Sequence, residues 1–246
     1  MTRKKKFAAL YVAQTAILTA LSFVLYLLKF NLPFVFPEFL EMQFSDLPAL
    51  IGGFTLGPAG GCLIVVLKGL LKMPLTSTAL AGEIADIIIG ISFVLPASLI
   101  YRIRKESPHL GIKNLLAMFV IFVPGDKKKS YADGLVGGKN AGTSLARSKN
   151  ANINTAIALI AGTVISTLTA ALLNRVLLVP FYVELFFHGN FDAIVGMLSK
   201  LYNGITRDSF YYYYISFGVL PFNLLRGTIS AALTFFVYKR IRKAFF

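Results

Sequence analysis

The sequence predicts an all-α membrane protein: one bundle of six transmembrane helices with both termini in the cytoplasm. Composition is the first indication, since 56% of the 246 residues are hydrophobic and 15% are charged, against about 25% charged in a soluble domain. The second is the grouping of apolar residues into stretches long enough to cross a bilayer, which takes about 20 residues. The third is the placement of the basic residues.

Basic residues gather in three regions, namely 3–6, 102–149 and 239–243. These regions hold eighteen of the 25 Lys and Arg residues and three acids, and the rest of the chain holds seven basic residues against eight acids. Basic loops of membrane proteins stay on the cytoplasmic side. We therefore interpret the net charge of +14 as a topology signal and predict no binding to nucleic acid.

The six predicted spans form a single domain over residues 1–246 and cover about 7–28, 47–57, 59–72, 79–101, 153–179 and 211–238. Glycines and Pro58 interrupt the second apolar stretch, and we divide it at Gly57-Pro58. A single span there would place segment 102–149 outside, against the charge rule. Short spans are tolerated where their irregular backbone is buried in protein.

Loops of different character connect the spans. Residues 106–152 are rich in Gly, Lys, Ser and Asn and predict a basic cytoplasmic loop. Residues 31–46, which carry Asp46, and residues 184–208 are expected outside. In the first span Ala9–Ala13 and Ala16–Ala20 are two small-xxx-small pairs on one face, which suits internal packing and an external partner helix equally.

Among the ionisable or amide residues within the apolar stretches are Lys68, Lys72, Glu83, Asp86, Asn174, Arg175, Asn223 and Arg226. Each charge inside a membrane costs at least about 2.5 kcal/mol, so such residues usually face a cavity or one another. For Lys72 and Arg175 we favour helix ends that reach water. Asn223 and Arg226 follow Pro221 about one turn apart, which indicates a binding site, and an amide suits the imide edge of a heterocyclic ligand.

The sequence contains no residue pattern that indicates an enzyme. His109 and His188 fall in loops on opposite sides of the membrane, and no metal-ligand spacing or nucleophile motif occurs. We predict that the protein is not an enzyme and has no catalytic residues, no metal site and no cofactor. Glu83 and Asp86, at i and i+3, leave open the alternative of proton sites in a self-sufficient carrier, although Lys68 and Arg226 are available to neutralise them.

Four stretches carry a family resemblance. They are Phe44-Ser45-Asp46-Leu47-Pro48-Ala49-Leu50-Ile51-Gly52-Gly53-Phe54 continuing to Gly60, Gly82-Glu83-Ile84-Ala85-Asp86 ending at Gly90, Leu173-Asn174 through Pro180, and Leu220-Pro221-Phe222-Asn223-Leu224-Leu225-Arg226-Gly227. With the alanine pairs, they resemble the substrate-binding S components of energy-coupling factor (ECF) vitamin transporters, and in particular the riboflavin-binding group. The likeness covers all proposed spans and leaves about 106–150 unmatched.

The resemblance implies a subunit of the bacterial plasma membrane that binds riboflavin, its transported ligand, from outside without hydrolysing ATP. It implies ligand contacts from Leu40, Met42, Phe44, Lys68, Asn174, Asn223 and Arg226. It also implies that the face of Ala9, Ala13, Ala16 and Ala20 docks onto a transmembrane T component carrying two cytoplasmic ATPases. Family members often carry Asn, Asn and Lys where this chain has Gly69, Asp86 and Arg226.

Three further hypotheses stay beside this one. The departures leave room for an S component for another vitamin such as pantothenate. A proton-coupled carrier belongs to a different class, and a membrane-embedded enzyme is the least favoured because its motifs are missing.

Overall fold

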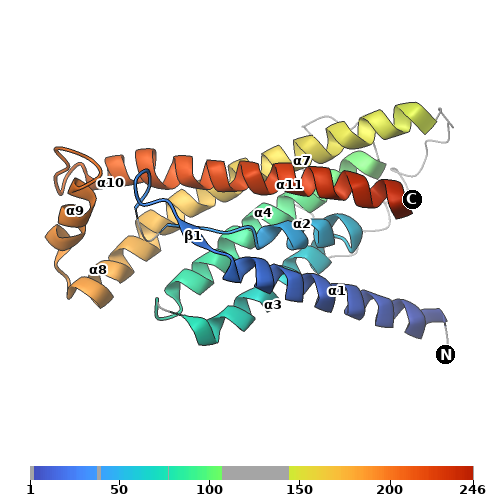
Figure 1. Ribbon diagram of the computed structural model, residues 1–246, viewed down its shortest axis with the longest axis horizontal. Coiled ribbons are helices and arrows are strands. Elements are labelled where there is room, and N and C mark those ends of the chain that lie inside the picture. Colours follow the sequence, from blue (N-terminus) through green and yellow to red (C-terminus); the bar gives the residue numbers. More distant parts are fainter. Residues whose placement is uncertain (1–2, 38–39, 77, 107–143, 246) are drawn as a thin grey trace, which may run out of the picture.

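The computed structural model describes residues 3–37, 40–76, 78–106 and 144–245, and these form a bundle of long helices (Figure 1). Its longest helices are α1 (Arg3–Leu27), α3 (Pro58–Lys72), α4 (Ala81–Glu106), α7 (Ser144–Leu173) and α11 (Leu220–Phe245). The start of α1 and the end of α11 lie at the same end of the bundle, and α9 and α10 lie at the other (Figure 1).

Within the part of the chain that the structure describes, five helical stretches are long and apolar enough to cross a membrane. They are Ala9–Leu27, Pro58–Leu75, Ala81–Arg104, Ala151–Phe187 and Phe210–Ile241. The predicted span 47–57 corresponds to α2 (Asp46–Thr55), which has 10 residues, about half the length that a full crossing takes. Its side chains from Pro48 to Phe54 are buried, so α2 packs inside the bundle. The six-span topology stays a prediction.

Glycines allow α2 and α3 to turn back on each other. Gly57, between the two helices, has φ of 91°, a left-handed conformation that favours glycine, and Pro58 then begins α3. A Cβ on Gly61 would lie 2.8 Å from the Cα of Gly53, so the two backbones meet where neither residue has a side chain. The 3₁₀ turn η1 (Met73–Leu75) follows α3.

A short hairpin closes the segment between α1 and α2. Strands β1 (Phe30–Asn31) and β2 (Glu41–Met42) pair antiparallel, with Phe30 opposite Met42. Beside it the Lys29 ammonium lies 2.8 Å from the Glu41 carboxylate. Partial burial lowers the pKa of Lys29, but the Glu41 charge and hydrogen bond outweigh it and raise that pKa above its ordinary value.

Two π-helical segments interrupt the last two long helical stretches. They are η3 (Asn174–Leu178), which leads into α8 (Val179–Phe187), and η4 (Tyr214–Val219), which follows α10 (Phe210–Tyr213). Each ends two residues before a proline, Pro180 or Pro221. Because proline has no N–H and its ring collides with the carbonyl four residues earlier, widening the preceding turn keeps the helix continuous. The helix that contains the predicted span 153–179 therefore continues past Val179 to Phe187.

The predicted loop 106–152 is too long at its C-terminal end, because α7 begins at Ser144. Apolarity marks where a helix enters a membrane, and a helix that starts in water needs no apolar residues before that point. Residues 107–143 of the predicted loop lie outside the described residues. The predicted outer segment 184–208 contains the end of α8 and the short helix α9 (Phe191–Ser199), whose first turn is capped by Asn190.

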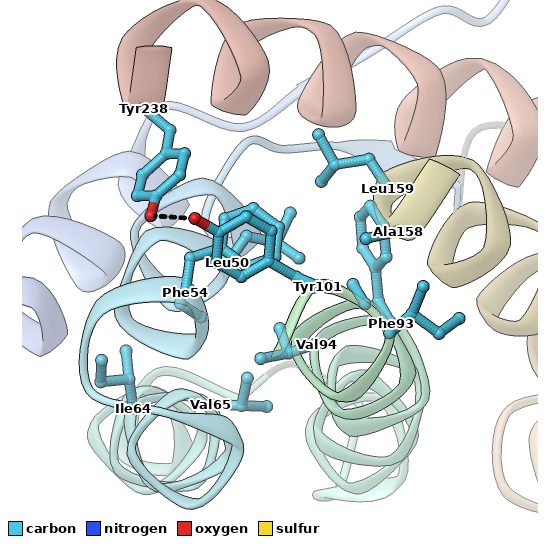
Figure 2. Close-up of a cluster of buried hydrophobic side chains, with 13 residues drawn as sticks. Leu50, Phe54, Ile64, Val65, Phe93, Val94, Tyr101, Ala158, Leu159 and Tyr238 are labelled. Atoms are coloured by element: carbon cyan, nitrogen blue, oxygen red, sulfur yellow. Dashed lines mark hydrogen bonds between the residues drawn. The ribbon is translucent and has the colours of Figure 1, made fainter. Parts of the chain in front are cut away.

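Two apolar clusters hold the bundle together. The Tyr101–Tyr238 cluster joins α2, α3, α4, α7 and α11, and its two tyrosine hydroxyls lie 2.8 Å apart (Figure 2). A second cluster joins α8, α9, α10 and η4 around Val183, Leu198 and Phe210.

Candidate ligand-binding cavity

A cavity of about 400 Å³ lies between α4, η3, α8, α9 and the first turns of α11. Small-molecule sites measure roughly 300–1,000 Å³ and are mostly apolar with a few placed polar groups. Half of the residues that line this cavity are apolar or aromatic, and amides and charged residues make up most of the other half. The lining residues are Tyr26, Lys29, Leu40, Glu41, Gln43, Lys72, Thr78, Gly82, Glu83, Ala85, Asp86, Ile89, Asn174, Leu178, Tyr182, Phe186, Phe187, Ile194, Met197, Phe222, Asn223 and Arg226.

Two asparagines face this cavity from separate helices. Asn174 begins η3 and donates its Nδ2 to the Ala170 carbonyl at 2.8 Å. Asn223 lies in the first turn of α11 and donates its Nδ2 to the Val219 carbonyl at 2.8 Å. The hydroxyl of Tyr214 donates to Oδ1 of Asn174 at 2.6 Å. Both amides were predicted ligand contacts, and the fold brings them to one cavity.

Five charged residues form a buried charge network at the inner side of the cavity: Asp46, Lys68, Lys72, Asp86 and Arg226. Asp46 accepts from Lys68 at 3.0 Å and from Arg226 at 2.7 Å. Asp86 lies 2.8 Å from the Lys72 ammonium, and 3.2 Å from both the Lys68 ammonium and the Arg226 guanidinium. Since an unpaired charge in the membrane interior is costly, this pairing makes the five residues compatible with a bundle core.

Polar side chains of the segment before α2 extend the buried charge network. Gln43 donates its Nε2 to Asp86 at 3.0 Å, and Ser45 donates its hydroxyl to Oε1 of Gln43 at 3.1 Å. The Lys68 ammonium donates to the Ser45 hydroxyl at 3.0 Å. Ser22 of α1 donates to the Ser45 backbone carbonyl. The network therefore ties α1, α3 and α4 to the segment that leads from the hairpin into α2.

The structure corrects the interpretation of Lys72 as a residue that reaches water. Its side chain is 4% exposed and paired with Asp86, and its ammonium lies 4.1 Å from the centre of the Tyr26 ring. Arg175 is exposed, 5.8 Å from the Tyr211 ring centre. Sequence reasoning placed Asp46 in an outer loop and missed its role. The sequence does hold a signal for this role, because the predicted spans contain more cations than acids. Buried cations in excess need a further buried carboxylate to pair with them.

The two acids considered as proton sites have different surroundings. Asp86 meets three cations, whereas Glu83 accepts hydrogen bonds from Thr76 at 2.7 Å and Thr78 at 2.9 Å. Lys68 and Arg226 therefore neutralise Asp46 and Asp86, and the partners of Glu83 are hydroxyl groups.

The remaining predicted contact residues divide between the lining and the layer behind it. Leu40 and Arg226 line the cavity. Met42 is buried behind Leu40 with Phe222, and Phe44 is half-buried with its ring 6.2 Å from that of Phe30. Lys68 is 0% exposed and lies outside the lining, where it serves the charge network.

The alanine face of α1 points away from the bundle. Ala9, Ala13, Ala16 and Ala20 are all exposed, whereas Thr15, Thr19, Ser22 and Tyr26 are buried. At about 100° per residue the two faces are roughly 120° apart. The alanines thus form a narrow, smooth surface outside the bundle, which excludes internal packing as their role within the described residues.

Comparisons with known proteins agree on the class of protein. The family model of the ECF transporter substrate-specific component matches residues 10–238. Among similar proteins are the riboflavin transporter RibU of Staphylococcus aureus (strain TCH60), 26% identical over 92% of this chain and 87% of the relative, and the riboflavin transporter FmnP of Bacillus subtilis (strain 168), 23% identical over 92% and 89%.

A solved structure described as "Structure and mechanism of the S component of a bacterial ECF transporter" has the same fold. Its TM-score is 0.59 at 22% identity, with 96% of this chain and 97% of that chain covered. The likeness runs over all five apolar helical stretches. The chain is a multi-pass protein of the bacterial plasma membrane and belongs to the family of ECF transporter substrate-specific components.

Proposed function

We propose that the protein binds riboflavin from outside the cell and delivers it inward as the substrate-specific subunit of an ATP-driven ECF transporter. The observation that carries the proposal is the cavity of about 400 Å³, in which two oriented amides from η3 and α11 lie among apolar and aromatic side chains that make up half of the lining. The names of two relatives as riboflavin transporters support it.

The chemistry of riboflavin fits this lining. The isoalloxazine is a flat apolar tricycle, which suits side chains such as Ile89, Leu178 and Phe222. Its imide edge offers an N–H donor between two carbonyl acceptors, and amide side chains complement both. The ribityl tail is neutral and polar, which suits Thr78 and Glu83 at the same cavity.

Transport would need partners that supply ATP hydrolysis. We propose that the exposed alanine face of α1 docks onto a transmembrane T component that carries two cytoplasmic ATPases. Small residues let helix backbones approach closely, so a bulky side chain there would hold the partner helix away. The Ala16→Leu and Ala20→Leu variants are expected to lose riboflavin uptake in cells and to keep riboflavin binding as isolated subunits.

Ala232→Leu is the matched control for that face, because Ala232 is an exposed alanine of α11. It is expected to retain both uptake and binding. If binding and uptake decline together in Ala16→Leu and Ala20→Leu, these alanines support the subunit itself and the docking proposal is wrong.

The test of ligand and class uses the chain alone. Protein purified from cells grown in ordinary medium should carry the visible absorption of bound flavin. In sealed vesicles it should bind riboflavin without accumulating it, even when a proton gradient is imposed. Accumulation under the gradient would favour the proton-coupled carrier, and tight binding of pantothenate in place of riboflavin would assign another vitamin.

A further inference from the structure

The side-chain oxygen of Asn174, Oδ1, already accepts a hydrogen bond in the protein without ligand. A backbone carbonyl only accepts hydrogen bonds, so the side-chain atom next to the Ala170 carbonyl must be Nδ2. The oxygen therefore points the other way, where the Tyr214 hydroxyl donates to it at 2.6 Å. One hydrogen of Nδ2 is used in the hydrogen bond to the Ala170 carbonyl. The second Nδ2 hydrogen is therefore the group that Asn174 can donate to a ligand in the cavity.

Asn223 is arranged differently. Its Nδ2 also faces the carbonyl four residues earlier, that of Val219 at 2.8 Å, so the orientation of this amide is fixed by the same argument. Among the described residues, however, Oδ1 of Asn223 has no hydrogen-bond partner comparable to Tyr214. Asn223 can therefore accept a hydrogen bond from a ligand.

Tyr214 is placed to hold Asn174 without meeting the ligand. Its side chain is 1% exposed and is absent from the cavity lining. Its ring is stacked on Phe210, with ring centres 5.5 Å apart. The two partners stand on the two π-helical segments, since Asn174 begins η3 and Tyr214 begins η4, and these segments are in contact.

We propose that Tyr214 is a positioning residue for the ligand site, which makes Asn174 a hydrogen-bond donor while Asn223 serves as an acceptor. This inference rests on the proposed function and deepens it. The pair would recognise a ligand edge with an acceptor beside an N–H donor, the pattern of one imide carbonyl and the adjacent N–H of an isoalloxazine. Without the tyrosine hydroxyl, Oδ1 of Asn174 loses this donor, and the amide keeps its hydrogen bond to the Ala170 carbonyl but is held less firmly in the orientation that presents its N–H to the ligand.

The test is a double-mutant cycle on riboflavin affinity, measured by titration calorimetry of the detergent-purified chain. Tyr214→Phe keeps the ring and removes the hydroxyl, and we expect about five- to twentyfold weaker binding. In the Asn174→Ala background the same change should alter affinity by less than about twofold. Equal weakening in both backgrounds, or wild-type affinity in Tyr214→Phe, would overturn the positioning role.

The relative affinities of riboflavin and its thio-analogues show whether Tyr214→Phe changes the position of Asn174 or disturbs the structure in general. Sulfur is a weaker acceptor than oxygen, so we expect wild-type protein to bind one of 2-thioriboflavin and 4-thioriboflavin several-fold more weakly than riboflavin. Tyr214→Phe should narrow that ratio. The matched control Tyr101→Phe also breaks a buried tyrosine hydrogen bond, away from the cavity, and should leave the ratio unchanged. An unchanged ratio in Tyr214→Phe contradicts the proposal.

Melting temperatures of the ligand-free protein distinguish this inference from the proposed function. Tyr214→Phe should lower the melting temperature more in the wild-type background than in the Asn174→Ala background. If the wild-type chain does not bind riboflavin, the proposed function is wrong, and this coupling still decides whether Tyr214 holds Asn174. Additive melting-temperature changes would overturn the pairing.

Discussion

The Tyr101–Tyr238 cluster and the cavity region use opposite means to fill the same bundle. In the cluster, regular helices meet through apolar side chains, and the two tyrosine hydroxyls pair with each other (Figure 2). Around the cavity, the buried charge network, two asparagines and two π-helical segments replace that regularity. Irregular backbone and buried charge persist in a membrane protein only where protein or a cavity surrounds them. We therefore infer that the cluster mainly stabilises the bundle and that the cavity region recognises the ligand.

The largest effect is expected from the buried charge network. Asp86→Ala leaves Lys68, Lys72 and Arg226 with Asp46 as the remaining carboxylate of the network. Removing one partner of a buried ion pair costs about 3–5 kcal/mol, so this variant should melt far below wild type or fail to fold. The measurement is thermal unfolding in detergent together with the yield of folded protein.

Glu41→Ala is the control for that prediction. The Glu41 carboxylate also pairs with a lysine, Lys29, but both side chains are more than one-third exposed. An exposed pair contributes about 0–1 kcal/mol, so the variant should melt close to wild type. Equal melting temperatures for Asp86→Ala and Glu41→Ala would mean that the network does not stabilise the fold.

Smaller changes in stability are expected from alanine at two helix glycines, and the two changes should have opposite signs. A Cβ on Gly61 would meet Val94 at 2.6 Å and the Gly53 backbone at 2.8 Å, whereas one on Gly196 would meet nothing within 4 Å. Gly61→Ala should therefore destabilise the cluster side by about 1–3 kcal/mol. Gly196→Ala should stabilise α9 by up to about 1 kcal/mol through helix propensity. Thermal unfolding of both variants checks the signs, and stabilisation by Gly61→Ala would contradict the close approach of α2 and α3.

A smaller destabilisation than that of Gly61→Ala is expected from Tyr101→Phe. It removes one buried hydrogen bond from the cluster at a cost of about 0.5–1.5 kcal/mol. Because Tyr101 and Tyr238 lie outside the cavity lining, riboflavin affinity should stay within twofold of wild type. If calorimetry finds a larger change in riboflavin affinity, the cluster also contributes to ligand binding, and the division of roles between the cluster and the cavity region is wrong.

Sequence reasoning identified the family and several residues of the cavity, and its errors have common physical causes. Motifs around Asn174 and Asn223 are local, so they are readable from the chain. The charge network joins residues far apart in sequence, such as Asp46 and Arg226, and their pairing depends on how the helices pack. Tyr214 illustrates the same limit, because four consecutive tyrosines carry no mark of which one meets an asparagine on another helix.

Helix ends differ from the ends of the predicted spans for a different reason. The predicted boundaries followed apolarity, which reports contact with lipid or core. The segments from Ser144 into α7 and from Pro180 to Phe187 are helical beyond the boundaries set by that signal. Backbone hydrogen bonding continues through polar residues, and a π-helical turn carries it past a proline.

Calorimetric titration of riboflavin into wild type and Asn223→Ala tests the central claim most directly. Asn203→Ala, which truncates an exposed amide in the segment between α9 and α10, is the matched control. We expect tight binding by wild type and Asn203→Ala. In Asn223→Ala, the loss of a hydrogen bond at about 1–3 kcal/mol should weaken binding about 5- to 150-fold. Wild-type affinity in Asn223→Ala would contradict recognition of riboflavin by the paired amides.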